Sequence, residues 1–410
     1  MNNKNILSVI SFALFLLLFY LYECFKMYIV ADESFTESST NTLVILALVA
    51  GTLGYCIYSR TEVERSNLVR SFTVQMLEMY LITIVFALFT PLVARIQYFE
   101  IILPLLLFFF SYKVATNIDN IPLFLTGVCI LALALAFYFL WNYQNNELYD
   151  IEKANLAAYT VLMFLPFLLC FRNNIVRIVS IIIIFIIILL SLKRGGFFAM
   201  IFSLMIYYWV KRYIETDKSN NYFALLFFLI VCAGFYLLFA RFNETSEGLM
   251  MARLEEISET GGSGRLVIYQ DKWHEIVNSN PLSLIFGHGW CATARVGSTK
   301  GLTAHNDILE IIYDFGLLGL ILFVSVMVSL CKILKELIDE KSRLAAPLGA
   351  SMGILLVLIC VSHIWIYSQF LSIFALFWGF VLAAKDSEYF EIEIDQEYGE
   401  EDNETEGTQI

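Results

Sequence analysis

Charged residues are scarce in this chain of 410 residues. Asp, Glu, Lys and Arg make up 16% of the sequence, hydrophobic residues make up 59%, and the mean hydropathy is +0.72. Soluble domains carry about 25% charged and about 45–50% apolar residues. Because a soluble fold of this length could not bury so much apolar surface, the composition excludes an ordinary soluble protein and predicts an integral membrane protein.

Patterns that bind metals, form disulfides or mark transporters are also missing. The chain has eight cysteines and four histidines but no CxxC pair and no Cys/His cluster, so we expect no metal site and no cofactor. A lone thiol in the large polar loop, Cys291, has no partner there for a disulfide. The sequence shows no internal repeat and no inverted pair of interrupted helices. Its first apolar run lacks a signal-peptide cleavage site and is interpreted as an uncleaved first span.

Long apolar runs dominate the sequence instead. About 20 apolar residues cross a bilayer as a helix, and only a helix satisfies the hydrogen bonds of a lipid-exposed backbone. We therefore predict an all-α, multi-pass membrane protein with about twelve spans, the last two separated around His363. These spans are residues 5–25, 42–59, 71–94, 100–115, 121–141, 154–171, 176–192, 195–212, 222–240, 315–334, 345–362 and 364–384.

The distribution of Lys and Arg predicts the orientation of these spans. With the N-terminus in the cytoplasm, 15 of the 26 basic residues fall in cytoplasmic connections, five in the opposite short loops and six in residues 241–314. Basic residues accumulate in cytoplasmic loops. We therefore expect both termini to be cytoplasmic and residues 241–314 to face outward.

The sequence divides into four parts. Residues 1–240 carry the first nine spans, 241–314 form one large outer loop or lid, 315–385 carry the last three spans, and 386–410 form a tail. The tail holds eleven acidic residues and no basic residue, so it accounts for nearly all of the net charge of −12. We expect the tail to be disordered and cytoplasmic.

The outer loop has a helical pattern although it is far longer than an ordinary connection. Apolar residues recur at helical spacing within 265–277, and a second amphipathic helix opens at 304–307 and leads into the tenth span. We predict a lid of two or so helices on the membrane surface. The apolar positions of the first helix are Tyr269, Trp273, Ile276 and Val277.

Three residues stand out by position. Arg194 lies at the outer end of a span before two glycines that would let a ligand approach the backbone, Arg265 follows a glycine-rich stretch, and His305 precedes a helix. Each also has a structural interpretation: Arg194 reaching lipid headgroups, Arg265 pairing with a loop carboxylate, His305 capping or packing. Their common location on one face of the membrane favours function. Glu78, inside the third span, is expected to face protein or water.

These residues belong to a series of short motifs that resembles the superfamily of bacterial O-antigen polymerases and O-antigen ligases. The resemblance is concentrated in residues 190–320, and the first 170 residues match only as hydrophobic helices. Lys193 departs from the family pattern, which often has a small residue there. The motifs are 191–196, 263–265 with Trp273, 280–282, Gly287 and Gly289, His305 and Asn306, and Gly316 and Gly319.

The resemblance implies a GT-C-like membrane glycosyltransferase whose donor is a glycan on undecaprenyl diphosphate. Arg194 and Arg265, with Lys193 as an added charge, would bind the diphosphate, because guanidinium groups bind phosphate oxygens in a bidentate fork. His305 would deprotonate or orient the acceptor hydroxyl. Asn306 is a further substrate-binding candidate. Four aromatic residues would stack on sugars or anchor the loop at the interface: Tyr269, Trp273, Trp290 and Tyr313.

Two activities of the superfamily are open, and no residue of this sequence distinguishes them. A polymerase joins glycan to another lipid-linked repeat unit, and a ligase transfers it to lipid A core. We favour the polymerase, because polymerases diverge strongly and this chain matches only the core motifs. The expected location is the bacterial inner membrane with a periplasmic active site. Expected partners are the lipid-linked oligosaccharide, the bilayer and a chain-length regulator protein, but not nucleic acid.

A transporter or flippase of lipid-linked sugar is the alternative from another class. It would explain about twelve helices and Glu78. Transporters, however, usually place polar sites near the midplane and show repeat symmetry, whereas the polar residues here gather at one face. The sequence therefore favours an interfacial enzyme.

Overall fold

The structure is a computed structural model that describes residues 3–29, 39–58, 67–88, 95–117, 121–145, 151–191, 193–215, 265–299, 301–365 and 367–386. Helices account for 87% of these residues, and none of them lies in a strand. The predicted all-α class is confirmed for this part of the chain.

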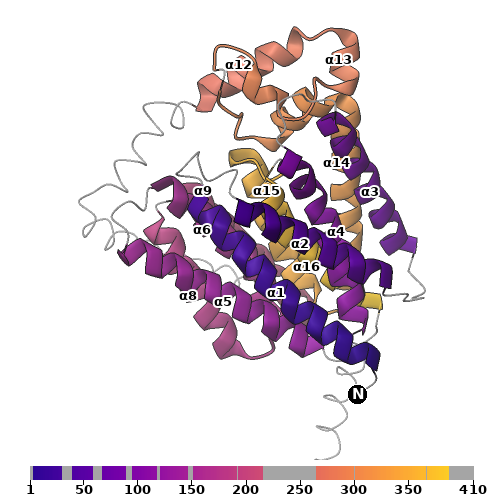
Figure 1. The fold of residues 1–410 in the computed structure, drawn as a ribbon, viewed down its shortest axis with the longest axis vertical. Coiled ribbons are helices and arrows are strands. Elements are labelled where there is room, and N and C mark those ends of the chain that lie inside the picture. The colour runs from indigo at the N-terminus through magenta and orange to yellow at the C-terminus, as the bar shows by residue number, and fades with distance from the viewer. Residues whose placement is uncertain are drawn as a thin grey trace, which may run out of the picture.

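The helices form one bundle with a smaller helical cap at one end (Figure 1). In chain order they are α1 (Asn3–Ile29), α2 (Ser39–Tyr58), α3 (Asn67–Leu88), α4 (Arg95–Asn117), α5 (Ile121–Asn145), α6 (Ile151–Met163), α7 (Leu165–Leu169), α8 (Asn174–Leu190), α9 (Arg194–Glu215), α12 (Arg265–Val277), α13 (Pro281–Phe286), the 3-10 helix η2 (Ala292–Arg295), α14 (Asp307–Asp339), α15 (Ala345–Val361) and α16 (Ser368–Asp386).

Six of the described helices are long and apolar enough to cross a membrane, namely α1, α3, α4, α5, α14 and α16. Four shorter apolar segments, 42–58, 156–169, 174–190 and 345–361, accompany them. The protein is therefore a multi-pass membrane protein. The predicted ninth span, 222–240, lies outside the described residues, and the count of twelve stays a prediction.

Helix α16 forms the centre of the bundle. Almost all of its side chains are buried, and it packs most extensively against α4. Close packing is visible where Ser111 Oγ donates a 2.6 Å hydrogen bond to Leu376 O, and where a Cβ on Gly379 would lie 2.3 Å from Phe108 O. The end of α15 at Val361 and the start of α16 agree with the predicted separation around His363.

Two glutamates of the N-terminal helices, Glu78 and Glu23, differ in burial. Glu78 is exposed on α3, so of the two expected surroundings, protein or water, the protein interior is excluded within the described structure. Glu23 of α1 is fully buried instead. Its Oε2 accepts hydrogen bonds from Gln369 Nε2 at 2.5 Å and Thr160 Oγ1 at 3.4 Å. These contacts join α1 to α16 and α6.

The cap consists of residues 265–306 and lies at the end of the bundle opposite the start of α1 (Figure 1). Its α13 and η2 pack on the first part of α14. At the junction Gly316 has φ 70° and breaks the regular helix of α14. A Cβ there would lie 2.3 Å from Ile285 O, so only glycine permits this backbone approach. The predicted run of the second loop helix into the next span is confirmed, with a kink at the junction.

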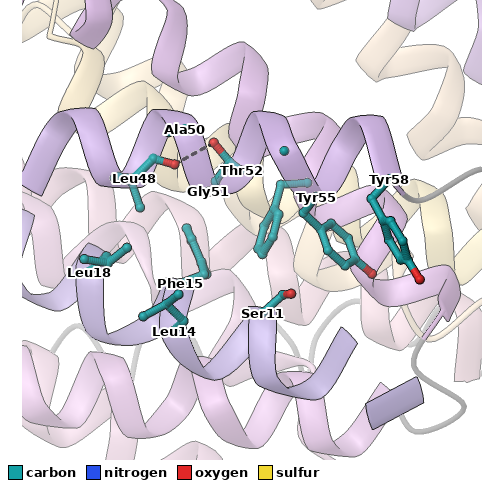
Figure 2. Close-up of a pocket in the computed structure, with 12 residues that line it drawn as sticks. Ser11, Leu14, Phe15, Leu18, Leu48, Ala50, Gly51, Thr52, Tyr55 and Tyr58 are labelled. Atoms are coloured by element: carbon teal, nitrogen blue, oxygen red, sulfur yellow. Dashed lines mark hydrogen bonds between the residues drawn. The ribbon is translucent and has the colours of Figure 1, made fainter. Parts of the chain in front are cut away.

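An apolar groove of about 280 Å³ lies between α1 and α2, away from the cap (Figure 2). Phe15 and Leu18 of α1, Leu48 and Tyr55 of α2, and Phe110 of α4 contribute to its walls. The residues singled out from the sequence do not line it. The groove therefore marks a gap between bundle helices and not the polar site.

Candidate functional site

The connection between α8 and α9 places Lys193 and Arg194 at the cap end of the bundle. Helix α8 ends at Leu190, and the backbone N–H of Lys193 donates to Ser191 Oγ at 3.3 Å before α9 begins at Arg194. Lys193 Nζ lies over the ring of Tyr159, 5.0 Å from its centroid. Arg194 is half-buried. The pattern of residues 193–196 predicts a tight turn, but the chain turns before Arg194, and Arg194, Gly195 and Gly196 are the first residues of α9.

Gly195 serves a packing purpose. A Cβ at this position would lie 2.7 Å from Tyr159 Oη and 3.2 Å from Val361 Cγ2. The space beside the glycine is thus filled by α6 and α15, and the expectation that it admits a ligand is wrong for Gly195. The absence of a side chain lets three helices meet beside Arg194.

Helix α12 directs Arg265 and Tyr269 to the end of α15. Arg265 Nη1 donates to Val361 O at 2.6 Å. Tyr269 Oη donates to Cys360 O at 3.1 Å and lies 3.3 Å from His305 O. Carbonyls at a helix C-terminus lack intrahelical partners and carry partial negative charge, so they attract such donors.

The apolar pattern of α12 (Arg265–Val277) predicts only part of its buried face. Ile276 is buried, but Trp273 is 55% exposed and Val277 is also exposed. The fully buried position is Lys272, whose Nζ donates to Val296 O at 2.6 Å. The structure therefore does not bring Trp273 to the site.

His305 and Asn306 precede α14 and have different tasks. Asn306 is the N-cap: its Oδ1 accepts from Leu309 N at 3.1 Å, and its Nδ2 donates to Cys360 O at 3.3 Å. His305 therefore does not cap the helix. It has φ 52°, and its ring stacks on His363 with a centroid distance of 4.6 Å.

The last turn of α15 is the common element of the site. Its Cys360 and Val361 carbonyls accept hydrogen bonds from Arg265, Tyr269 and Asn306. Val361 also contacts the Gly195 position. The structure thus gathers the predicted residues Lys193, Arg265, Tyr269, His305 and Asn306 around one helix end, and Arg194 adjoins this helix end through its neighbour Gly195.

The electrostatics keep the histidines neutral. Burial, followed by the charges of Arg265 and Lys193, lowers the pKa of His305 to about 4. Burial and then the neighbouring His305, Lys193 and Arg265 hold the pKa of His363 well below its usual value. A neutral imidazole can accept a proton. The arrangement therefore combines cationic groups that suit an anion with a potential proton acceptor.

Sequence reasoning missed Tyr159, His363 and Glu310. Tyr159 gave no signal, and His363 was noticed only as a boundary between spans. Glu310 had a signal, because Asp307, Glu310 and Asp314 recur on one face of an apolar helix and all three are buried. Asp307 accepts from Ile364 N at 2.9 Å and Trp365 N at 3.1 Å, which ties α14 to the connection before α16.

Two aromatic candidates belong to the core of the cap. Trp290 is buried against Phe315, with ring centroids 6.0 Å apart. Tyr313 is also buried, and its ring stacks on His288 at 4.1 Å. The sugar-stacking interpretation is wrong for these two rings in this conformation. Within the described residues, no group of three or more His, Cys, Asp or Glu side chains is arranged to hold a metal.

Fold and site together define a helical multi-pass membrane protein with a cationic, histidine-containing cluster at one end of its bundle. Residues 179–324 match a family model described as O-antigen ligase. The match runs from α8 into α14 and includes both arginines and His305. This stretch is thus similar to the O-antigen ligase family, and the resemblance to the superfamily of O-antigen polymerases and ligases is confirmed. A search of curated proteins finds no match.

Proposed function

We propose that this protein is a polysaccharide polymerase of the inner membrane. It would join glycan from an undecaprenyl-diphosphate-linked donor to a sugar hydroxyl of another lipid-linked repeat unit on the periplasmic side. The observation that carries the proposal is the convergence of Lys193, Arg265 and neutral His305 near the end of α15. All three residues lie inside the stretch matched by the family model.

The diphosphate of the donor is the proposed ligand of Arg194, Arg265 and Lys193. Breaking the glycosidic bond leaves negative charge on the diphosphate, and preorganised cations stabilise such charge as it develops. The guanidinium of Arg265 uses Nη1 for Val361 O and has further N–H donors for phosphate oxygens. Tyr269 and Asn306 would line the same site. We propose no role for Trp273 there, because its side chain is largely exposed.

His305 is the proposed base. As the acceptor hydroxyl attacks the anomeric carbon, its proton passes to the imidazole, the glycosidic bond breaks and the electron pair leaves with the diphosphate. A positioned base typically contributes about 10²–10⁴-fold to the rate. Diphosphate bound to Arg265 and Lys193 would offset the two charges that oppose protonation of His305. Donor binding would thus prepare the base.

The position of the site suits a substrate that is half lipid. The polyprenyl tail must stay in the bilayer while both sugars are in water, so the reaction belongs at the boundary. A polar cluster at the end of a bundle of membrane-spanning helices meets this requirement. The chain-length regulator and the lipid-linked oligosaccharide remain the proposed partners.

In vitro elongation is the direct test. Purified protein in nanodiscs is incubated with a synthetic undecaprenyl-diphosphate repeat unit and a chelator, and wild type is compared with Arg194→Ala, Arg265→Ala and His305→Ala. Two matched controls are Arg177→Ala, at the far end of α8, and His274→Ala, exposed on α12. A ladder of longer glycans made by wild type and both controls, and lost in the three site variants, is the expected result.

Other outcomes assign other functions. Wild type that makes no ladder, but transfers glycan once lipid A core is supplied, is a ligase. Protein that is inert with both acceptors, yet moves the lipid-linked substrate across a liposome bilayer, is a transporter. Activity that requires a metal overturns the expectation, from the sequence, that the protein has no metal site.

A further inference from the structure

His305 has a backbone conformation that needs support. Its φ of 52° lies in the left-handed region, which residues other than glycine rarely occupy. Such a conformation persists only where the surroundings enforce it, and it is common at functional sites. The conformation also decides which way the imidazole points from the segment before α14.

Glu310 holds the backbone of His305. Its side chain is fully buried in the first turns of α14, and its Oε1 accepts the N–H of His305 at 3.1 Å. The same oxygen lies 3.8 Å from Nδ1 of His363. One buried carboxylate therefore fixes the left-handed residue and borders the second histidine.

His363 holds the side chains of the same segment. Its ring stacks on the ring of His305, with a centroid distance of 4.6 Å and an interplanar angle of 23°. It also stacks on the ring of Tyr367, with a centroid distance of 4.5 Å and an interplanar angle of 13°. Its Nδ1 is hydrogen-bonded to Thr303 Oγ1 at 3.0 Å. The segment 303–305 is thus held through Thr303, through the backbone of His305 and through its ring.

We propose that Glu310 and His363 are positioning residues that hold His305 in its left-handed conformation and direct its imidazole toward the reacting groups. The inference rests on the proposed function of His305. Neither residue is assigned a proton-transfer step. Their effect is on the geometry of the base, where a displacement of about 1 Å can cost about 10²-fold in rate.

The charged and titratable groups around the two imidazoles come from four segments. Lys193 precedes α9, Arg265 and Tyr269 lie on α12, Glu310 lies on α14, and Tyr367 precedes α16. Replacing His363 by Phe keeps a ring for the stack and removes the nitrogen that binds Thr303. Replacing it by Ala removes both contacts.

Elongation kinetics and hydrogen–deuterium exchange together test this inference. The variants are Glu310→Leu, Glu310→Gln, His363→Ala and His363→Phe, and size-exclusion chromatography reports whether each is folded. We expect Glu310→Leu and His363→Ala to lower kcat by about 10²-fold at unchanged KM for the donor. Glu310→Gln, which keeps an oxygen acceptor, and His363→Phe should recover most of the loss.

Exchange of the peptide that contains residues 303–306 gives a readout independent of turnover. Faster exchange in Glu310→Leu and His363→Ala than in wild type is expected. If the exchange of this peptide in the variants equals that in wild type, the inference is overturned. A fall in kcat without faster exchange would show that Glu310 or His363 takes part in the reaction directly. If the variants exchange faster but wild type elongates no glycan, the proposed function is refuted, while the positioning of His305 by these residues stands.

Discussion

The imidazoles of His305 and His363 stack face to face with a centroid distance of 4.6 Å, although one residue precedes α14 and the other follows α15. Both rings are kept neutral by burial and by nearby cations. His305, whose ring stacks on His363, is the imidazole proposed to accept the proton of the acceptor hydroxyl. The predictions below follow from this arrangement and from the helices that create it.

The pH dependence of elongation should change when Lys193 is removed. Burial, Arg265 and Lys193 lower the pKa of His305 from 6.5 to about 4, so the free enzyme keeps its base unprotonated through neutral pH. In wild type, kcat/KM should fall only as the pH approaches that value. In Lys193→Met one cation is gone, the pKa rises, and the acid limb should move toward 6.5. Identical acid limbs in the two proteins would contradict the assignment.

Gly195 and Gly196 should differ sharply in their tolerance of a methyl group. A Cβ at Gly195 meets Tyr159 Oη at 2.7 Å, whereas the nearest atom to a Cβ at Gly196 is at 3.5 Å. Gly195→Ala should displace α9 and Arg194 and lower kcat/KM by about 10²-fold. Gly196→Ala is the control and should retain activity. Adding Tyr159→Phe, which removes the clashing oxygen, should restore part of the activity of Gly195→Ala.

The junction of cap and bundle should be sensitive at Gly316. Alanine there would have to adopt φ 70° and ψ −169°, a region that almost only glycine occupies and that costs about 1–3 kcal/mol, and its Cβ would lie 2.3 Å from Ile285 O. The midpoint of thermal unfolding should therefore fall. Gly54→Ala is the control, since a Cβ at that position of α2 meets nothing within 4 Å. Equal midpoints for the two variants would refute the close approach of α13 and α14.

Substitutions of Tyr269 and Trp273, which lie on different faces of α12, should differ in their effect on donor binding. Tyr269→Phe removes the hydroxyl that contacts Cys360 O and His305 O, with an expected loss of about 1 kcal/mol per hydrogen bond. Trp273→Ala removes a ring that is 55% exposed. Donor binding should weaken in Tyr269→Phe and stay unchanged in Trp273→Ala. The measurement is an equilibrium binding titration with the lipid-linked repeat unit in nanodiscs.

Local signals carried much of the site prediction. The turn before Arg194, the helix that starts at Arg265 and the helix after Asn306 follow from capping residues, glycines and apolar spacing, which act over a few residues. Those signals also place the arginines and His305 at helix ends. Nothing in them brings the three segments together.

The long-range contacts had no such signal. Arg265 binds the carbonyl of Val361, and backbone carbonyls leave no trace in an amino-acid pattern. Burial of Lys272 contradicts the apolar stripe of α12, because the choice of buried face depends on Val296, which its Nζ reaches. Glu78 was singled out within an apolar run and is exposed, whereas Glu23 is fully buried, since only the contact of α1 with α16 distinguishes them.

The end of α15 has a consequence for cooperativity. Two neighbouring carbonyls, of Cys360 and Val361, hold a donor from the start of α12, another from its second turn and a third from the N-cap of α14. A shift of that one turn would disturb the contacts of Arg265, the proposed anion-binding residue, and of Asn306, which adjoins the proposed base His305. Anion binding and proton acceptance, the two proposed functions of the site, should therefore weaken together when this turn moves.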